Sequence, residues 1–148
     1  MMDFLLLASL KRFSSVGLLT IRVIVGLFLL WAIANILRSE THLRGFASSL
    51  AQFNFPLPYL MARISAYAQA FIAVSFTIGF LTRWAGLLCA AHFGVALAMV
   101  DRFAGMRGAF PAAVLIAIGV FLAFHGAGRF GLDSLFEERA RQRFDVHY

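Results

Sequence analysis

Four long apolar runs, almost free of charge, constrain the fold of this chain more than any other feature. They cover residues 16–37, 64–81, 84–100 and 110–126, and charged residues lie beyond their ends. A helix that crosses the roughly 30 Å hydrocarbon core of a bilayer needs about 20 mostly apolar residues. The runs lack the sustained polar and apolar alternation that a membrane β-barrel requires. The sequence therefore predicts an all-α fold, a transmembrane four-helix bundle.

Composition supports the same fold class. The chain is 61% hydrophobic and 14% charged, whereas a soluble domain is about half apolar and about a quarter charged. The net charge of +6 comes from basic residues that flank the runs, where they meet lipid headgroups, so we expect no nucleic-acid partner. Cys89 is the only cysteine, which excludes an internal disulfide and a cysteine-based metal site.

The chain is expected to form a single membrane domain over residues 1–148. The first loop, residues 37–62, is expected to lie at the membrane interface. Its two prolines, in Phe55–Pro58, predict an extended turn at that stretch. A capping-box spacing from Ser134 to Glu137 predicts a short tail helix over about 134–144. Met1–Leu10 is apolar but has no preceding positive residue, so no cleavable signal peptide is expected.

Basic residues favour one orientation. Four spans place both termini on the same side of the membrane, and positive charge favours the cytoplasmic side of a bacterial-type inner membrane. The N-terminus, second loop and tail carry Lys11, Arg12, Arg83, Arg129, Arg139, Arg141 and Arg143, and the other two loops carry Arg38, Arg44, Arg63, Arg102 and Arg107.

Arg22 is the strongest functional signal, because it is a charge inside an apolar run. Its burial costs several kcal/mol unless it snorkels or finds partners. The spans hold no acidic residue, so a counter-charge must come from a loop or the tail. The glycine-rich turn at 126–131 leads to Asp133, which is our candidate. The alternatives are a snorkelling Arg22, and an Asp133 that pairs with Arg129 or caps the tail helix.

Three further polar residues lie in the spans. Gln69 could join helices by hydrogen bonds or contact a ligand. His92 and His125 raise the idea of a b-type haem, but they differ in depth by about 10 Å at 1.5 Å per residue, whereas bis-histidine ligation needs the same depth. We therefore expect hydrogen-bonded core histidines and no metal site.

Small residues predict the helix contacts. Gly86, Ala90 and Gly94 share one face of the third span, and Ala113 and Ala117 share one face of the fourth. We expect such faces to let helix backbones approach closely in lipid.

Several segments together resemble the DoxX family of small four-helix membrane proteins. They are Leu19–Val23 with Gly26 and Leu29–Trp31, then Phe55–Pro58, Gly79–Arg83 and Gly126–Asp133. The resemblance implies the four-helix membrane fold and, through the family's name, a link to a thiosulfate:quinone oxidoreductase subunit. Members often carry a glutamate where this chain has Gln69. Glutamine keeps the hydrogen bonds but cannot titrate, which puts a proton-coupled role in doubt.

Three functions remain open at this point. The first is an accessory subunit that anchors or stabilises a larger membrane complex, respiratory or photosynthetic, and is not catalytic by itself. The second is a quinone-interacting subunit of an oxidoreductase, in which Arg22, Gln69 and His92 hydrogen-bond the quinone. The third is a small transporter or channel, which one charged residue in the spans disfavours. The sequence encodes no cofactor site, so quinone or lipid is the expected ligand class, and the partners expected are the bilayer and other membrane subunits.

Overall fold

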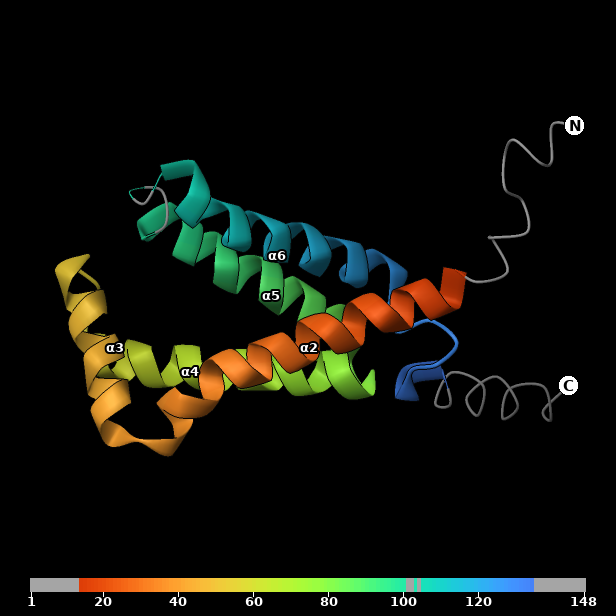
Figure 1. Cartoon of the computed structure of the whole chain (residues 1–148), viewed down its shortest axis with the longest axis horizontal. Helices are drawn as coiled ribbons and strands as arrows, with labels where there is room; N and C mark the ends of the chain where they lie inside the picture. The colour runs from red at the N-terminus through yellow and green to blue at the C-terminus, as the bar shows by residue number, and fades with distance from the viewer. Residues whose placement is uncertain (1–13, 101–102, 104, 135–148) are drawn as a thin grey trace, which may run out of the picture.

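The computed structural model describes residues 14–100, 103 and 105–134, and these form five helices (Figure 1). The helices are α2 (Ser14–Arg38), α3 (Glu40–Gln52), α4 (Pro58–Ile78), α5 (Thr82–Met99) and α6 (Gly105–His125). Of these, α2, α4, α5 and α6 are long and apolar enough to cross a membrane, so the predicted four-span fold is confirmed. The expected tail helix at 134–144 and the Met1–Leu10 segment lie outside the described residues, apart from Ser134.

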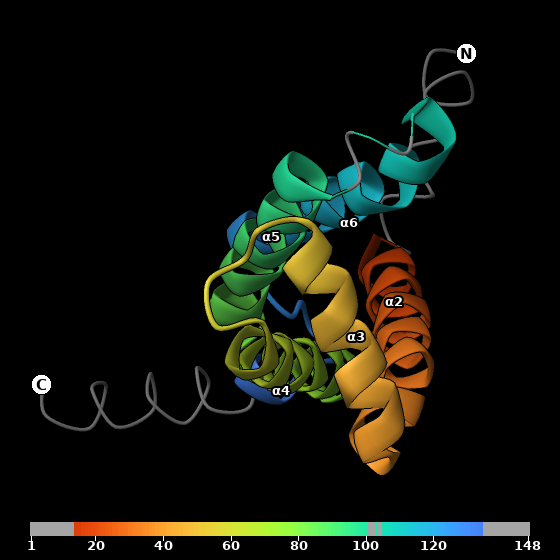
Figure 2. The ribbon, with the colours of Figure 1, turned by 90° about the vertical axis from the view of Figure 1, so that its left-hand side faces the viewer.

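The bundle is built from two close helix pairs, α2 with α4 and α5 with α6 (Figure 2). Glycines stand where the backbones approach. A Cβ added at Gly26 of α2 would lie 2.9 Å from the Ala73 carbonyl oxygen of α4. One added at Gly86 of α5 would lie 2.6 Å from the Gly119 carbonyl oxygen of α6. Small residues therefore set the spacing of both pairs, as is usual where lipid offers no hydrophobic drive for association.

The prediction that the small-residue faces of the third and fourth spans form close helix contacts is correct only in part. Gly86 lies at the α5–α6 contact, but nothing lies within 4 Å of a Cβ added at Gly94. Ala113 and Ala117 are exposed, and Gly119 takes their place. The buried face of α6 is Ala112, Leu115, Gly119 and Leu122. Ala113 is one residue from that face, a rotation of about 100° around the helix.

The loop expected over residues 37–62 contains a helix, α3, that was not predicted, whereas the predicted turn at Phe55–Pro58 does lie between α3 and α4. Leu43, Ala47 and Leu50 form the buried face of α3 and pack with Ala62 of α4, at the spacing of one helical stripe. Helix α3 crosses one end of the bundle at a steep angle to α4 (Figures 1 and 2). The prolines follow α3, and Pro58 opens α4, where a missing N–H costs nothing.

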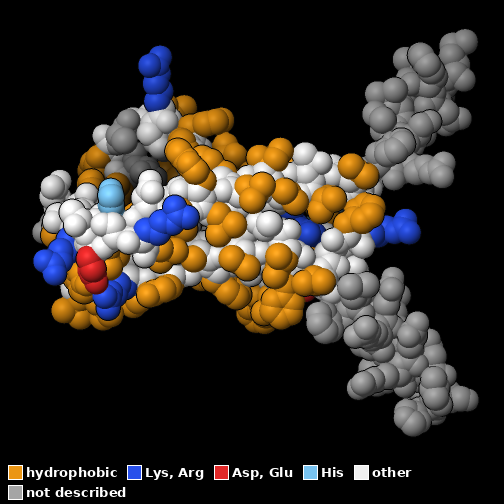
Figure 3. Space-filling model, turned by 60° about the horizontal axis from the view of Figure 1, so that its bottom comes forward, with side chains coloured by type: hydrophobic (Ala, Val, Ile, Leu, Met, Phe, Trp, Pro, Cys, Tyr) orange, Lys and Arg blue, Asp and Glu red, His pale blue; other side chains and the backbone are white. Residues whose placement is uncertain are grey.

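The outside of the bundle suits lipid. Large apolar side chains are exposed along the spans, among them Trp31 (75%) and Phe124 (78%). Hydrophobic side chains cover much of the middle of the face in Figure 3, and most charged side chains lie towards its two ends. The start of α2 and the end of α6 lie at the same end of the bundle, which agrees with an even number of spans.

Candidate functional sites

Arg22 is buried and hydrogen-bonded between three segments of the chain. Its side chain is 1% exposed. Its Nε donates to the Phe76 carbonyl oxygen at 2.9 Å, and its Nη1 donates to the Ala127 carbonyl oxygen. Phe76 lies in the last turn of α4, where carbonyls lack partners within the helix. Arg22 therefore joins α2 to the end of α4 and to the turn after α6, and it does not snorkel.

Asp133 caps a helix that begins 51 residues earlier in the chain. Its two carboxylate oxygens accept the N–H groups of Leu81 at 2.7 Å and Thr82 at 2.9 Å. Its own N–H donates to the Gly79 carbonyl oxygen at 3.0 Å. Leu81, the N-cap residue of α5, makes no side-chain cap. A carboxylate here satisfies open N–H groups and complements the helix dipole.

The predicted direct ion pair between Arg22 and Asp133 is therefore wrong, although the turn does carry Asp133 over the end of the bundle. Within the described residues, the only ion pair closer than 4.0 Å joins Arg63 to Glu40. Backbone groups take up the direct bonds of both side chains. We call Arg22, Asp133 and the backbone groups they bind the Arg22–Asp133 latch.

Gly79 leaves room for the latch. Its φ is +75°, a conformation that glycine adopts without strain. A Cβ added there would collide with the Arg22 guanidinium and lie 2.7 Å from the Cα of Gly131. Glycine at this junction thus allows both the turn and the close contact.

An apolar cavity of about 530 Å³ lies between α4 and α5, and α3 closes one end of it. Gln69 and His92 both line it, so we call it the Gln69–His92 cleft. Gln69 lies nine residues before Ile78, and His92 lies ten residues after Thr82. At 1.5 Å per residue both are about 14–15 Å from the α4–α5 junction, close to the middle of a bilayer. The remaining lining residues are Phe46, Leu50, Phe55, Met61, Ile64, Ser65, Ala68, Leu88, Ala91, Phe93, Val95, Ala96 and Val100.

Gln69 and His92 lack hydrogen-bond partners within the described part of the chain. Neither the Gln69 amide nor the His92 imidazole bonds any residue that the structure describes. The His92 ring meets the Phe93 ring edge to face, with centroids 4.9 Å apart. The hydrogen-bonded core histidine expected at position 92 is therefore not found. Two groups able to donate and accept hydrogen bonds face an apolar space instead.

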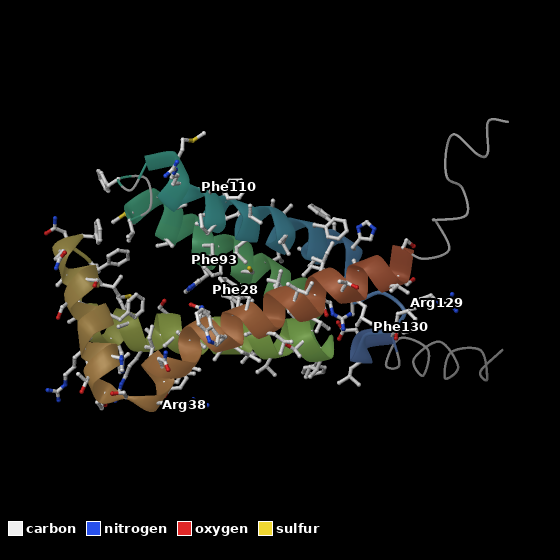
Figure 4. The ribbon with its side chains drawn as sticks, viewed as in Figure 1. Phe28, Arg38, Phe93, Phe110, Arg129 and Phe130 are labelled. Atoms are coloured by element: carbon white, nitrogen blue, oxygen red, sulfur yellow. The ribbon has the colours of Figure 1, made fainter. Side chains whose placement is uncertain are left out.

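A second cavity, also about 530 Å³, lies at the end of the bundle that holds the latch. We call it the polar pocket. It is lined by Phe80, Leu81, Arg83, Trp84, His125, Gly126, Ala127, Gly128, Arg129, Asp133 and Ser134. Figure 4 shows Arg129 beyond the helices at this end, opposite Arg38. The six predicted site residues thus divide into two groups, with Gln69 and His92 in the cleft and His125, Arg129 and Asp133 around the polar pocket. Arg22 lies beneath the latter.

A cluster that sequence reasoning missed holds α3 onto α4. The Glu40 carboxylate accepts the Tyr59 hydroxyl at 2.8 Å and Arg63 Nη2 at 2.9 Å. The Tyr59 hydrogen bond, and to a lesser extent the Arg63 bond, lower the pKa of Glu40 below its ordinary value. Arg63 also lies 5.1 Å from the Tyr59 ring centroid. No sequence spacing links these three residues, because the fold of α3 back onto α4 brings them together.

A family model for DoxX matches residues 17–102, more than half of the chain. The chain belongs to the DoxX family. No curated protein and no solved structure gives a significant match.

The DoxX match runs from α2 to the end of α5, so it includes Arg22, Gln69 and His92. It stops before α6 and the Gly126–Asp133 segment. In this DoxX protein Gln69 is one of the polar side chains of the cleft. The family match agrees with the multi-span membrane fold, whereas the chemistry of the cleft depends on the residues that line it.

Proposed function

We propose that this chain is a quinone-binding accessory subunit of a membrane redox complex, and that the Gln69–His92 cleft holds the quinone ring. One observation carries the proposal: two polar side chains without partners, at the same depth on facing helices, line one apolar cavity. Its volume of about 530 Å³ falls within the usual range for small-ligand sites, about 300–1,000 Å³.

A quinone fits this cleft chemically. Its two carbonyl oxygens accept hydrogen bonds, and the Gln69 amide and a His92 ring N–H can donate them. Gln69 and His92 are partly exposed to the cleft, and at this depth a bilayer offers no water to bond them, so each bond to the ligand would satisfy a group that otherwise lacks a partner. The apolar walls, including Phe46 and Leu50 near the α3 end, suit the ring and its hydrocarbon tail. Mid-bilayer depth matches where a lipid-soluble quinone moves.

The role assigned to the chain is accessory because the electrons would come from a partner. Among the described residues, His92 is the only ordinarily titratable side chain that lines the cleft, and Gln69 cannot exchange a proton. From the sequence, Arg22 is expected beside Gln69 and His92 as a third hydrogen-bond donor to the quinone. In the structure Arg22 does not line the cleft, and it donates to backbone carbonyls elsewhere. The quinone proposal therefore no longer includes Arg22.

Photolabelling tests the cleft. The purified chain in nanodiscs is labelled with an azido-quinone, and decylubiquinone and decylbenzene serve as competitors with and without carbonyls. We expect the label on peptides of α4 and α5 and competition by decylubiquinone alone. Gln69→Leu and His92→Leu should each weaken decylubiquinone binding by roughly tenfold, the worth of about one hydrogen bond.

Matched controls are available on α3. Gln52→Leu and His42→Leu make the same chemical changes at exposed positions outside the cleft, and both should bind as wild type does. Equal weakening by the control variants, or label confined to other segments, would remove the support for a quinone site here.

The accessory role has its own test. Deleting the chain should reduce the yield of a larger membrane complex that co-purifies with it, as measured by mass spectrometry of gently solubilised membranes. The remaining complex should keep its chemistry but lose quinone-dependent turnover. An unchanged complex with unchanged turnover would contradict the proposal.

A further inference from the structure

The polar pocket plays no part in the proposed function, and its lining is rich in hydrogen-bond donors. Arg83 and Arg129 both line it, both are exposed, and neither has an acidic partner within 4.0 Å among the described residues. Arg83 leans over the turn after α6, since a Cβ added at Gly126 would lie 3.1 Å from Arg83 Nε. His125 adds an imidazole at the end of α6.

The backbone of the turn adds another donor. The Ala127 carbonyl points inward and accepts from Arg22. Because the peptide unit is planar and trans, the N–H of Gly128 points the opposite way, away from Arg22. That N–H has no backbone partner among the described residues. Outward N–H groups in such turns bind anions.

The single acidic group of the lining does not compete for these donors. Asp133 uses its two carboxylate oxygens to accept the N–H groups of Leu81 and Thr82. Its charge is directed at the start of α5, where the helix dipole complements it. The two arginines therefore leave the lining with an excess of positive charge.

The position of the pocket relative to the membrane further limits which ligand it can bind. Helix α4 ends at Ile78, α5 begins at Thr82 and α6 ends at His125, so the pocket lies where the spans leave the hydrocarbon. Trp84, 69% exposed, stands at its edge, a usual place for tryptophan at the interface. The phosphates of lipid headgroups lie at this level.

We propose that the polar pocket binds a phosphate group, held by Arg83, Arg129 and the Gly128 N–H. Arginine guanidinium groups and backbone N–H groups are the usual ligands of phosphate. A phospholipid headgroup and soluble phosphate are the two sources of this chemistry at the membrane surface. The pocket, about 530 Å³, also has room for the glycerol of a headgroup.

Two measurements separate the sources. Native mass spectrometry of the full chain, mixed with equal amounts of dioleoyl phosphatidylglycerol and dioleoylglycerol, compares lipids with the same tails, only one of which has a phosphate. Phosphorus NMR of inorganic phosphate, with the protein in a phosphate-free detergent, follows the soluble anion. Retention of phosphatidylglycerol over dioleoylglycerol assigns the site to lipid, and line broadening of inorganic phosphate assigns it to the soluble ion.

Arginine variants locate the site. Arg83→Gln and Arg129→Gln should each reduce phosphate or phosphatidylglycerol binding about fivefold, the usual worth of one arginine near an anionic surface. Arg107→Gln, an exposed arginine at the start of α6 and outside the pocket, is the matched control and should bind as wild type does. Arg83→Lys keeps the charge and should keep most of the binding.

The proposal fails if neither ligand binds, or if Arg107→Gln reduces binding as much as the pocket variants do. Thermal melting of each variant separates loss of binding from loss of fold, and Arg129→Gln, at an exposed turn residue, remains informative if Arg83→Gln does not fold. Gln69→Leu should leave phosphate binding unchanged, so this result is independent of the quinone proposal.

Discussion

Replacing Arg22 by methionine removes the guanidinium donors that Arg22 contributes to the latch and keeps an unbranched side chain in its place. The structure places Nε 2.9 Å from the Phe76 carbonyl oxygen and Nη1 against that of Ala127. In the variant both carbonyls stay buried and lose the donor that Arg22 supplies. The turn after α6 also loses its direct bond to α2, which should loosen the end of the bundle.

The size of the effect follows from these contacts. Hydrogen bonds to a charged group contribute about 1.5–3 kcal/mol each after the loss of water is counted, so two contribute roughly 3–6 kcal/mol. Methionine recovers about 1.5 kcal/mol through apolar burial. We therefore expect Arg22→Met to lower the free energy of unfolding by about 1.5–4.5 kcal/mol.

Equilibrium unfolding in dodecyl maltoside titrated with sodium dodecyl sulfate, followed by tryptophan fluorescence, measures this loss. Arg38→Met is the matched control, because Arg38 lies at the other end of α2 and is exposed. It should change stability by less than about 0.5 kcal/mol. If Arg22→Met unfolds like Arg38→Met, the hydrogen bonds of Arg22 do not hold the bundle together and the reasoning is refuted.

Other features lead to three further predictions. Gly86→Val should separate α5 from α6 and cost several kcal/mol in the same unfolding assay. Gly94→Val should cost far less, because nothing lies within 4 Å of a Cβ added at Gly94. The protection of α3 amides, taken relative to intrinsic exchange at each pH, should be highest above about pH 5. It should fall as pH drops through the lowered pKa of Glu40, because a group with a depressed pKa stabilises the fold only while ionised. Glu40→Gln should remove this change in protection. Topology reporters fused at Ser49 and after Tyr148 should give opposite signals, and matching signals would contradict an even number of spans.

The spans were predictable because a bilayer demands long apolar helices, and the hydropathy of the sequence shows them directly. Arg22 could also be singled out, because a charge inside such a run requires an explanation. The glycines before Asp133 correctly indicated a sharp turn back over the bundle. The hydrogen-bond partners of Arg22 and Asp133 could not be predicted, because they are backbone carbonyls and N–H groups, which carry no sequence signal.

Two features that were not predicted could have been predicted from the sequence. Leu43, Ala47 and Leu50 recur at helical spacing in the loop where the prolines argued against a helix, so α3 was visible in the pattern. Counting residues from the α4–α5 junction gives Gln69 and His92 equal depth, so the residue numbers alone are enough to pair them. The Glu40 cluster and the polar pocket needed the fold, since they depend on how α3 and the turn after α6 pack.

The long sequence separation within the latch has a consequence for how the protein is made. Arg22 enters the membrane in the first span, yet one of its acceptors, Ala127, is 105 residues away. The cap of α5 arrives 52 residues after Leu81. While the ribosome is still translating α6, the first span carries a charge without this acceptor and α5 starts with open N–H groups. Completion of the last turn therefore closes the structure, and a chain truncated before residue 127 would present a nascent, incompletely assembled bundle to membrane quality control.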